Sequence, residues 1–101
     1  MRMLMHVKFS HTKFNEAVRD GTIGRKIQQI LEETRPEATY FTEYEGRRGV
    51  ILIVNVENPS KVPGVAEPWF LLFDADVQFH IVISPEELGR AGLETSAKKW
   101  M

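Results

Sequence analysis

The spacing of apolar residues switches along the chain between the strand period and the helix period, and the order of these switches constrains the fold most strongly. Residues 3–9 and residues 77–83 are apolar at alternate positions, as expected for strands with one buried face. Residues 39–44 are rich in β-branched and aromatic side chains, and residues 50–56 form a nearly continuous apolar run. These four segments are predicted to be strands.

Two helical segments separate the strands. After the first strand, Ser10 or Thr12 can cap a helix that residues 20–22 interrupt and that ends before Pro36. After the third strand a second helix follows, and Pro68 is expected to kink it or to start a separate turn. The apolar residues of the two segments recur at helical spacing and are Phe14, Ala17, Val18, Ile23, Ile27, Ile30 and Leu31 in the first, and Val62, Val65, Ala66, Trp69 and Phe70 in the second.

The order strand, helix, strand, strand, helix, strand predicts an α+β fold. Residues 45–49 contain two glycines and predict a hairpin between the second and third strands. Right-handed crossovers after the first and third strands then give an antiparallel sheet of order 4-1-3-2, with the helices on one face. This is the ferredoxin-like βαββαβ sandwich. With 101 residues, the chain is expected to form one such domain over residues 1–101. A capping-box sequence at residues 84–87 predicts a short C-terminal helical extension from about residue 84.

Alternation assigns each strand residue to one of two faces. The face expected to meet the helices carries Met3, Met5, Val7, Leu52, Val54, Val56, Val77, Phe79 and Ile81. The other face carries Leu4, His6, Lys8, Tyr40, Thr42, Tyr44, Ile51, Ile53, Asn55, Asp76, Gln78, His80 and Val82. Its aliphatic side chains would leave a large apolar patch exposed on a monomer. We therefore predict a homodimer in which two such faces pack against each other.

Over residues 2–91 the order of elements resembles the dimeric α+β barrel superfamily. That superfamily includes cofactor-independent monooxygenase-like and muconolactone-isomerase-like domains. Three short stretches are similar to an uncharacterised bacterial domain family of that barrel type: Phe41-Thr42-Glu43-Tyr44, Glu67-Pro68-Trp69-Phe70 and Ser84-Pro85-Glu86-Glu87-Leu88. The resemblance implies a homodimer whose sheets enclose a cavity for a small ligand. It carries no diagnostic catalytic motif, so it implies no catalytic residue.

Composition excludes several classes of function. Thirteen basic and fourteen acidic side chains give a net charge of -1, so no bulk positive charge favours nucleic acid or an anionic membrane. The absence of cysteine excludes a disulfide framework, a thiolate metal site and a cysteine nucleophile. The apolar runs are much shorter than the roughly 20 residues that span a bilayer. We therefore expect a cytoplasmic protein without nucleic-acid or membrane partners.

Histidines supply the most reactive groups on the predicted free face of the sheet. His6 and His80 share the parity of neighbouring strands, and imidazole can act as acid, base or ligand near neutral pH. The alternative is that both are structural, hydrogen-bonded across the barrel or the dimer interface. The predicted ligand-binding residues are His6, Lys8, Tyr40, Thr42, Asn55, Gln78 and His80. No cofactor and no metal site are predicted, because the spacing of histidines and carboxylates supports none.

Other polar residues have simpler explanations. His11 is expected to be a surface residue near a helix cap, and Glu43 an edge-strand charge that blocks unwanted pairing. Asp74 and Asp76 are expected in a solvated strand entry, although such a pair can bind a cation. The adjacent arginines at positions 47 and 48 could grip an anion, but solvated turn residues are the expectation. Trp69 and Phe70 are expected in the core or in a cavity wall, and Trp100 against a partner subunit or the helices.

Three functions remain open at this stage. The first is a homodimeric small-molecule-binding domain with a cavity between its two sheets. The second is a cofactor-independent enzyme of the monooxygenase or isomerase type, using His6 or His80 with Tyr40 or Tyr44 as acid–base groups. The third is a structural or assembly dimer without a ligand. No nucleophile motif, phosphate loop or dinucleotide fingerprint is present to choose an enzyme class.

Overall fold

The computed structural model describes residues 1–101 and contains one four-stranded sheet. The elements are β1 (Arg2–Lys8), α1 (His11–Asp20), α2 (Ile23–Thr34), β2 (Ala38–Tyr44), β3 (Arg47–Asn55), a 3-10 turn (Pro59–Lys61), α3 (Val62–Phe73), β4 (Asp76–Ile81), α4 (Pro85–Gly89) and α5 (Leu93–Lys99). No helix in this set is both long and apolar enough to cross a lipid bilayer.

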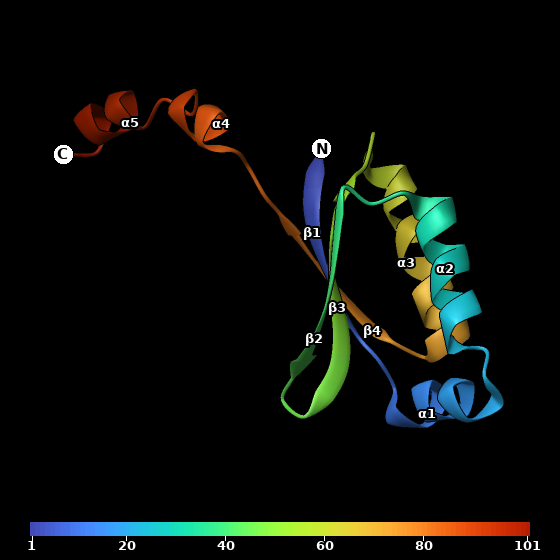
Figure 1. Ribbon diagram of the computed structural model, residues 1–101. Helices are drawn as coiled ribbons and strands as arrows, with labels where there is room; N and C mark the ends of the chain where they lie inside the picture. Colours follow the sequence, from blue (N-terminus) through green and yellow to red (C-terminus); the bar gives the residue numbers. More distant parts are fainter.

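The sheet has the predicted topology. Its order is β2-β3-β1-β4, which is 4-1-3-2 read from the other edge, and every neighbouring pair is antiparallel. Helices α1, α2 and α3 lie on one side of the sheet (Figure 1). The ferredoxin-like α+β fold is therefore confirmed. The first crossover holds two helices because α1 ends at Gly21, whose left-handed backbone (φ 81°) few other residues adopt.

The hairpin between β2 and β3 is tighter than expected. Only Glu45 and Gly46 connect the strands, and both have positive φ angles of 53° and 77°. Two consecutive positive φ values match the twist of the flanking strands, so pairing continues up to the turn. As a result β3 begins at Arg47 and not at residue 50.

The core lies between the sheet and the three helices. Met5 sits between Leu52 and Phe79 in the register, and the side chains of Met5 and Leu52 are fully buried. Phe9 packs edge to face against Trp69 and Phe73, with ring centroids 5.7 and 5.0 Å apart. The helix-facing set assigned from alternation forms this core, with one exception. Ile81 is 65% exposed, because it lies at the end of the edge strand beyond the helices.

Helix α3 runs through Pro68 without ending, so the expected separate turn is not formed. A proline inside a helix costs about 3 kcal/mol, because one hydrogen bond is lost and the ring crowds the preceding turn. Trp69 and Phe73, both fully buried, hold the segment after the proline against the sheet. Burial of two large aromatic side chains is worth about as much as the proline costs, or more. Phe70 points away from the core and is 40% exposed.

The last two helices stand apart from the rest of the protein. Every residue from Pro85 to Met101 is exposed, and α4 and α5 extend away from the end of β4 on the side opposite to α2 and α3 (Figure 1). The radius of gyration is 17.1 Å, compared with about 13 Å for a compact domain of 100 residues. We call residues 82–101 the C-terminal arm. Within it, the predicted capping box forms, since Ser84 and Glu87 each bond to the other's backbone N–H.

Candidate functional site

The register of the strands places all seven predicted ligand-binding residues on the sheet face away from the helices. His6 lies opposite Ile51 on β3 and Gln78 on β4. His80 lies opposite Leu4, which makes the two histidines diagonal neighbours on adjacent strands. We call this surface the open face; it comprises Leu4, His6, Lys8, Tyr40, Thr42, Tyr44, Gly49, Ile51, Ile53, Asn55, Gln78 and His80.

Three polar side chains gather at one end of the open face. The imidazole of His6 meets the ring of Tyr44 edge to face, with 5.4 Å between centroids. The ammonium nitrogen of Lys8 lies 4.5 Å from the centroid of the same ring, within cation–π range. Tyr44 is on the edge strand β2, so its ring reaches across β3 to meet two β1 residues. We call these three residues the His6–Lys8–Tyr44 cluster.

His6 has an unsatisfied ring nitrogen. Its Nε2 atom is buried and has no hydrogen-bond partner. Loss of water around the ring lowers the pKa of His6, and the positive charges of Lys8 and His80 lower it further. The imidazole is therefore neutral at pH 7. A neutral ring with a free nitrogen can accept a proton or a hydrogen bond from a ligand, whichever tautomer it holds.

The other predicted residues are more dispersed. Tyr40 is on the open face but is 68% exposed, and Gln78 and His80 are exposed on the edge strand β4. The Thr42 hydroxyl donates to the Glu43 carbonyl oxygen at 3.3 Å. Asn55 lies toward the opposite end of the sheet, where its side-chain oxygen accepts from the N-terminal amine at 3.1 Å.

The structure thus brings together His6, Lys8 and His80 from the predicted set. Tyr44 joins them; the sequence analysis named it as an acid–base candidate in the enzyme alternative but did not include it among the ligand-binding residues. The signal for Tyr44 was its spacing of two from Thr42, together with a glycine on the neighbouring strand at position 49.

Arg47 is not the solvated turn residue that the sequence suggested. Its guanidinium donates to the carbonyl oxygens of Phe9 and Lys8 at 3.1 and 3.3 Å, and it pairs with the Asp76 carboxylate at 3.0 Å. These contacts connect the start of β3 to the end of β1 and the start of β4. Asp76 is at the solvated strand entry that the sequence predicted, as the first residue of β4 with a side chain 72% exposed, and its carboxylate is also half of this ion pair. The adjacent Arg48 also has partners: its side chain donates to Asn15 at 2.8 Å and lies over the Phe14 ring.

The remaining candidates occupy separate positions. Glu43 lies on the edge strand β2 opposite Arg48, His11 is exposed at the first position of α1, and Asp74 is the left-handed residue that ends α3. No group of three or more histidine, aspartate or glutamate side chains is arranged to hold a metal ion. Trp100 is 78% exposed on the arm, so it does not pack against the helices that cover the sheet.

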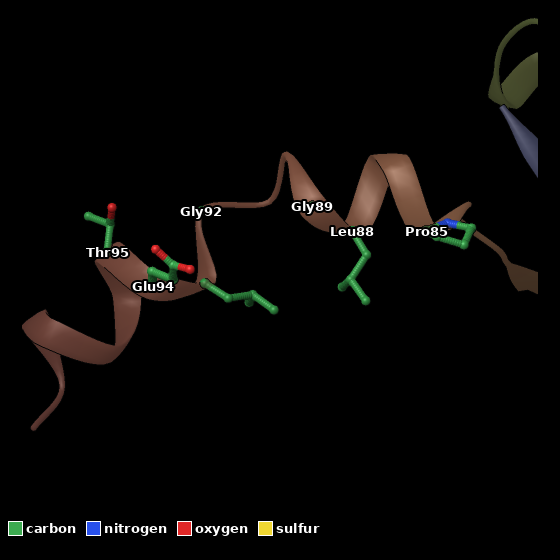
Figure 2. A pocket seen from close by; sticks show the side chains of 7 residues that line it. Pro85, Leu88, Gly89, Gly92, Glu94 and Thr95 are labelled. Carbon is green, nitrogen blue, oxygen red and sulfur yellow. The ribbon is translucent and has the colours of Figure 1, made fainter.

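The surface hollows of the chain lie away from the His6–Lys8–Tyr44 cluster. None is lined by His6, Lys8, Tyr44 or His80. One hollow lies between α4 and α5 on the arm, where Pro85, Leu88 and Leu93 supply its apolar lining (Figure 2). Another lies beside the hairpin, between Arg48 and the residues His11 and Asn15. In this single chain, the open face is an uncovered surface and not a cavity.

The fold and the open face define a ferredoxin-like α+β protein with a mixed polar and apolar sheet surface. No protein-family model and no curated protein matches the chain. Among solved structures, it is similar to 5-chloro-2-hydroxyhydroquinone dehydrochlorinase from Burkholderia phenoliruptrix AC1100, solved with 2,5-dihydroxybenzoquinone. The TM-score is 0.61 at 17% identity, over 86% of this chain and 98% of that one. A designed protein, Ferredog-Diesel, gives a TM-score of 0.48 at 12% identity, over 80% and 85% of the two chains. The likeness to the dehydrochlorinase concerns the fold.

Proposed function

We propose that this protein is a cytoplasmic homodimer that binds a small molecule between the open faces of its two sheets. The observation that carries the proposal is the unsatisfied Nε2 atom of His6, whose ring lies with Lys8 around Tyr44 on a face where Leu4, Ile51 and Ile53 are only half-buried. An orphaned buried nitrogen costs about 1–3 kcal/mol, so a partner for it is favoured. Covering the open face with a second copy would bury Leu4, Ile51 and Ile53 further and enclose the His6–Lys8–Tyr44 cluster between the two sheets.

The chemistry of the cluster favours a ligand with an acidic hydroxyl group. The neutral His6 ring can accept a hydrogen bond from a phenol or enol. A negative charge on that oxygen would be stabilised by the Lys8 ammonium. The aromatic rim of Tyr44 offers an edge or face for a ring to stack on. The structurally similar dehydrochlorinase was solved with a dihydroxybenzoquinone, which makes that compound a suitable first probe.

A second candidate function is catalysis at the same site. A cofactor-independent monooxygenase- or isomerase-like enzyme needs a neutral base, and the lowered pKa of His6 provides one near pH 7. Tyr44 is the nearer tyrosine and would be the acid–base partner in preference to Tyr40. A structural dimer without a ligand is the third candidate. It requires the partner protomer to fill the space over His6 completely.

Native mass spectrometry of the gently purified protein tests the proposal. We expect the mass of a dimer with a bound small molecule, and binding of added 2,5-dihydroxybenzoquinone by calorimetry. The double variant His6→Phe/His80→Phe should fold but lose both the co-purifying small molecule and the calorimetric binding of the probe. The matched control is His11→Phe, which changes the third histidine, on α1. A dimer with neither a co-purifying nor an added ligand would favour the structural candidate, and turnover of a probe would favour the enzyme.

A further inference from the structure

The C-terminal arm carries three large apolar side chains that have no surface to pack on within this chain. Leu88, Leu93 and Trp100 are 49%, 58% and 78% exposed. The helices that carry them have five and seven residues, and isolated helices of that length are marginal in water. Most helix stability in proteins comes from packing of an apolar face. The arm therefore needs a surface that its own protomer does not provide.

The path of the chain points to the side where such a surface would lie. Val82 still donates its N–H to the Arg2 carbonyl at 3.2 Å, so the arm leaves the sheet from the end of β4. It then extends on the side opposite to α2 and α3, which is the side of the open face (Figure 1). A second copy packed on the open face would occupy the same side of the sheet.

Twofold symmetry limits where the C-terminal arm can dock on the second copy. The sheet has two unpaired edges, β2 and β4. A twofold axis parallel to the strands places β4 of one protomer against β2 of its partner, and this closure leaves no edge exposed. Rotation about this axis does not exchange the two ends of the sheet. Residues at the Arg2 end of one protomer therefore lie at the same end of the barrel as the corresponding residues of its partner. Val82 lies at the Arg2 end of β1, and the register places Ala38 at that end as well.

We propose that the C-terminal arm of each protomer packs on a second copy of this chain, across the first half of its β2 strand. Phe41, 55% exposed on the face of β2 opposite to the open face, supplies the apolar surface there. The open side of α4 and α5, with Leu88 visible in Figure 2, supplies the other half of the contact. This inference rests on the homodimer proposed above and adds an exchanged arm to it.

Crosslinking between differently tagged copies tests the contact. The chain has no cysteine, so introduced thiols react alone. One tagged copy carries Arg90→Cys on the arm, and the other carries Ala38→Cys at the start of β2. With a flexible bismaleimide, we expect a covalent species that contains both tags. The matched control replaces Ala38→Cys by Arg19→Cys, an exposed position on α1 at the opposite end of the sheet, and should give little of that species.

The dimer dissociation constant provides an independent measurement. The triple variant Leu88→Ser/Leu93→Ser/Trp100→Ser should raise it about tenfold or more, because buried apolar anchors dominate such contacts. The control variant Glu94→Ser/Thr95→Ser/Lys98→Ser changes the same arm without changing its net charge and should leave the constant within about twofold.

The outcomes separate this inference from the homodimer itself. A dimer that shows no crosslink between Arg90→Cys and Ala38→Cys, and no weakening in the apolar triple variant, overturns the arm contact and leaves the dimer standing. A crosslink that forms only within one chain, in a doubly substituted copy diluted into unsubstituted protein, also overturns it. A wild-type chain that sediments as a monomer at all concentrations removes both proposals.

Discussion

A Cβ atom placed on Gly49 would lie 3.5 Å from Nε2 of His6 and 2.7 Å from the carbonyl oxygen of Val7. Gly49 is opposite Lys8 on β1 and opposite Thr42 on β2, so it occupies the position over which Tyr44 reaches toward His6. The missing side chain therefore has two effects. It allows β3 to approach the β1 backbone, and it leaves space for the His6–Lys8–Tyr44 cluster to form.

Gly49→Ala should destabilise the protein by about 1–3 kcal/mol, because the new methyl group collides with backbone and not with a flexible side chain. The control is Gly24→Ala in α2, where a Cβ atom meets nothing within 4 Å. This second change should raise stability slightly, by about 0.5 kcal/mol, since alanine is the better helix former. Urea unfolding of the two variants at one protein concentration measures both shifts. Equal effects of the two changes would contradict the close approach at Gly49.

The lowered pKa of His6 predicts a specific loss of stability on the acid side. Between the lowered value and about 6.5, the unfolded chain binds a proton at His6 and the folded chain does not. Stability therefore rises with pH through this window and falls as the pH drops below about 6.5. His6→Gln should remove this part of the pH dependence, whereas His11→Gln should keep it. The measurement is the free energy of unfolding of each protein from about pH 5 to pH 8.

Arg47 should contribute more to stability than its neighbour in the hairpin. Arg47→Ala leaves the Phe9 and Lys8 carbonyl oxygens without their side-chain donor and breaks the pair with Asp76, at a cost of about 1–3 kcal/mol. Arg48→Ala removes a more exposed side chain and should cost less, about 1 kcal/mol or below. Asp76→Asn removes the negative charge but keeps a side-chain oxygen that can accept a hydrogen bond, so it measures the electrostatic contribution of the Arg47–Asp76 pair. Thermal unfolding of the three variants ranks them, and an equal loss for both arginines would refute this role of Arg47.

The fold was predictable because its signals are local and repeat along the chain. Alternation assigned Met5 to the helix side and His6 to the other side, and the register agrees for both. Contacts that depend on the strand order were not predictable. Arg47 meets Phe9 and Asp76 only after three strands have paired, and no spacing in the sequence shows that. Local sequence left two outcomes open at Pro68, a kinked helix or a separate turn, and packing of Trp69 against the sheet favours the continuous helix.

The sequence was sufficient to predict which sheet face carries the candidate site, but not which side chains on that face are in contact. Parity is sufficient to place Tyr44 and His6 on the same surface, yet the strands that carry them are not neighbours. Their contact depends on a side-chain conformation that crosses β3 above Gly49. For the C-terminal arm, too, a local feature was predictable and its position relative to the sheet was not. The capping box at Ser84 fixed where α4 starts, whereas the direction in which α4 leaves the sheet follows from the end of β4.

The proposed dimer predicts that a charge in the middle of the open face is not tolerated. Ile53 lies between Leu4 on β1 and Ala38 on β2, and in the dimer its side chain would face the partner sheet. Ile53→Glu should raise the dimer dissociation constant by at least about a hundredfold, because a carboxylate buried without a partner costs several kcal/mol. Leu71→Glu places the same charge on α3, at a side chain that is 73% exposed on the helix side, and should leave the dimer intact. Sedimentation velocity at micromolar concentration measures the effect, with circular dichroism to show that each variant is folded. If Ile53→Glu stays dimeric while folded, the two subunits join through a surface other than the open face.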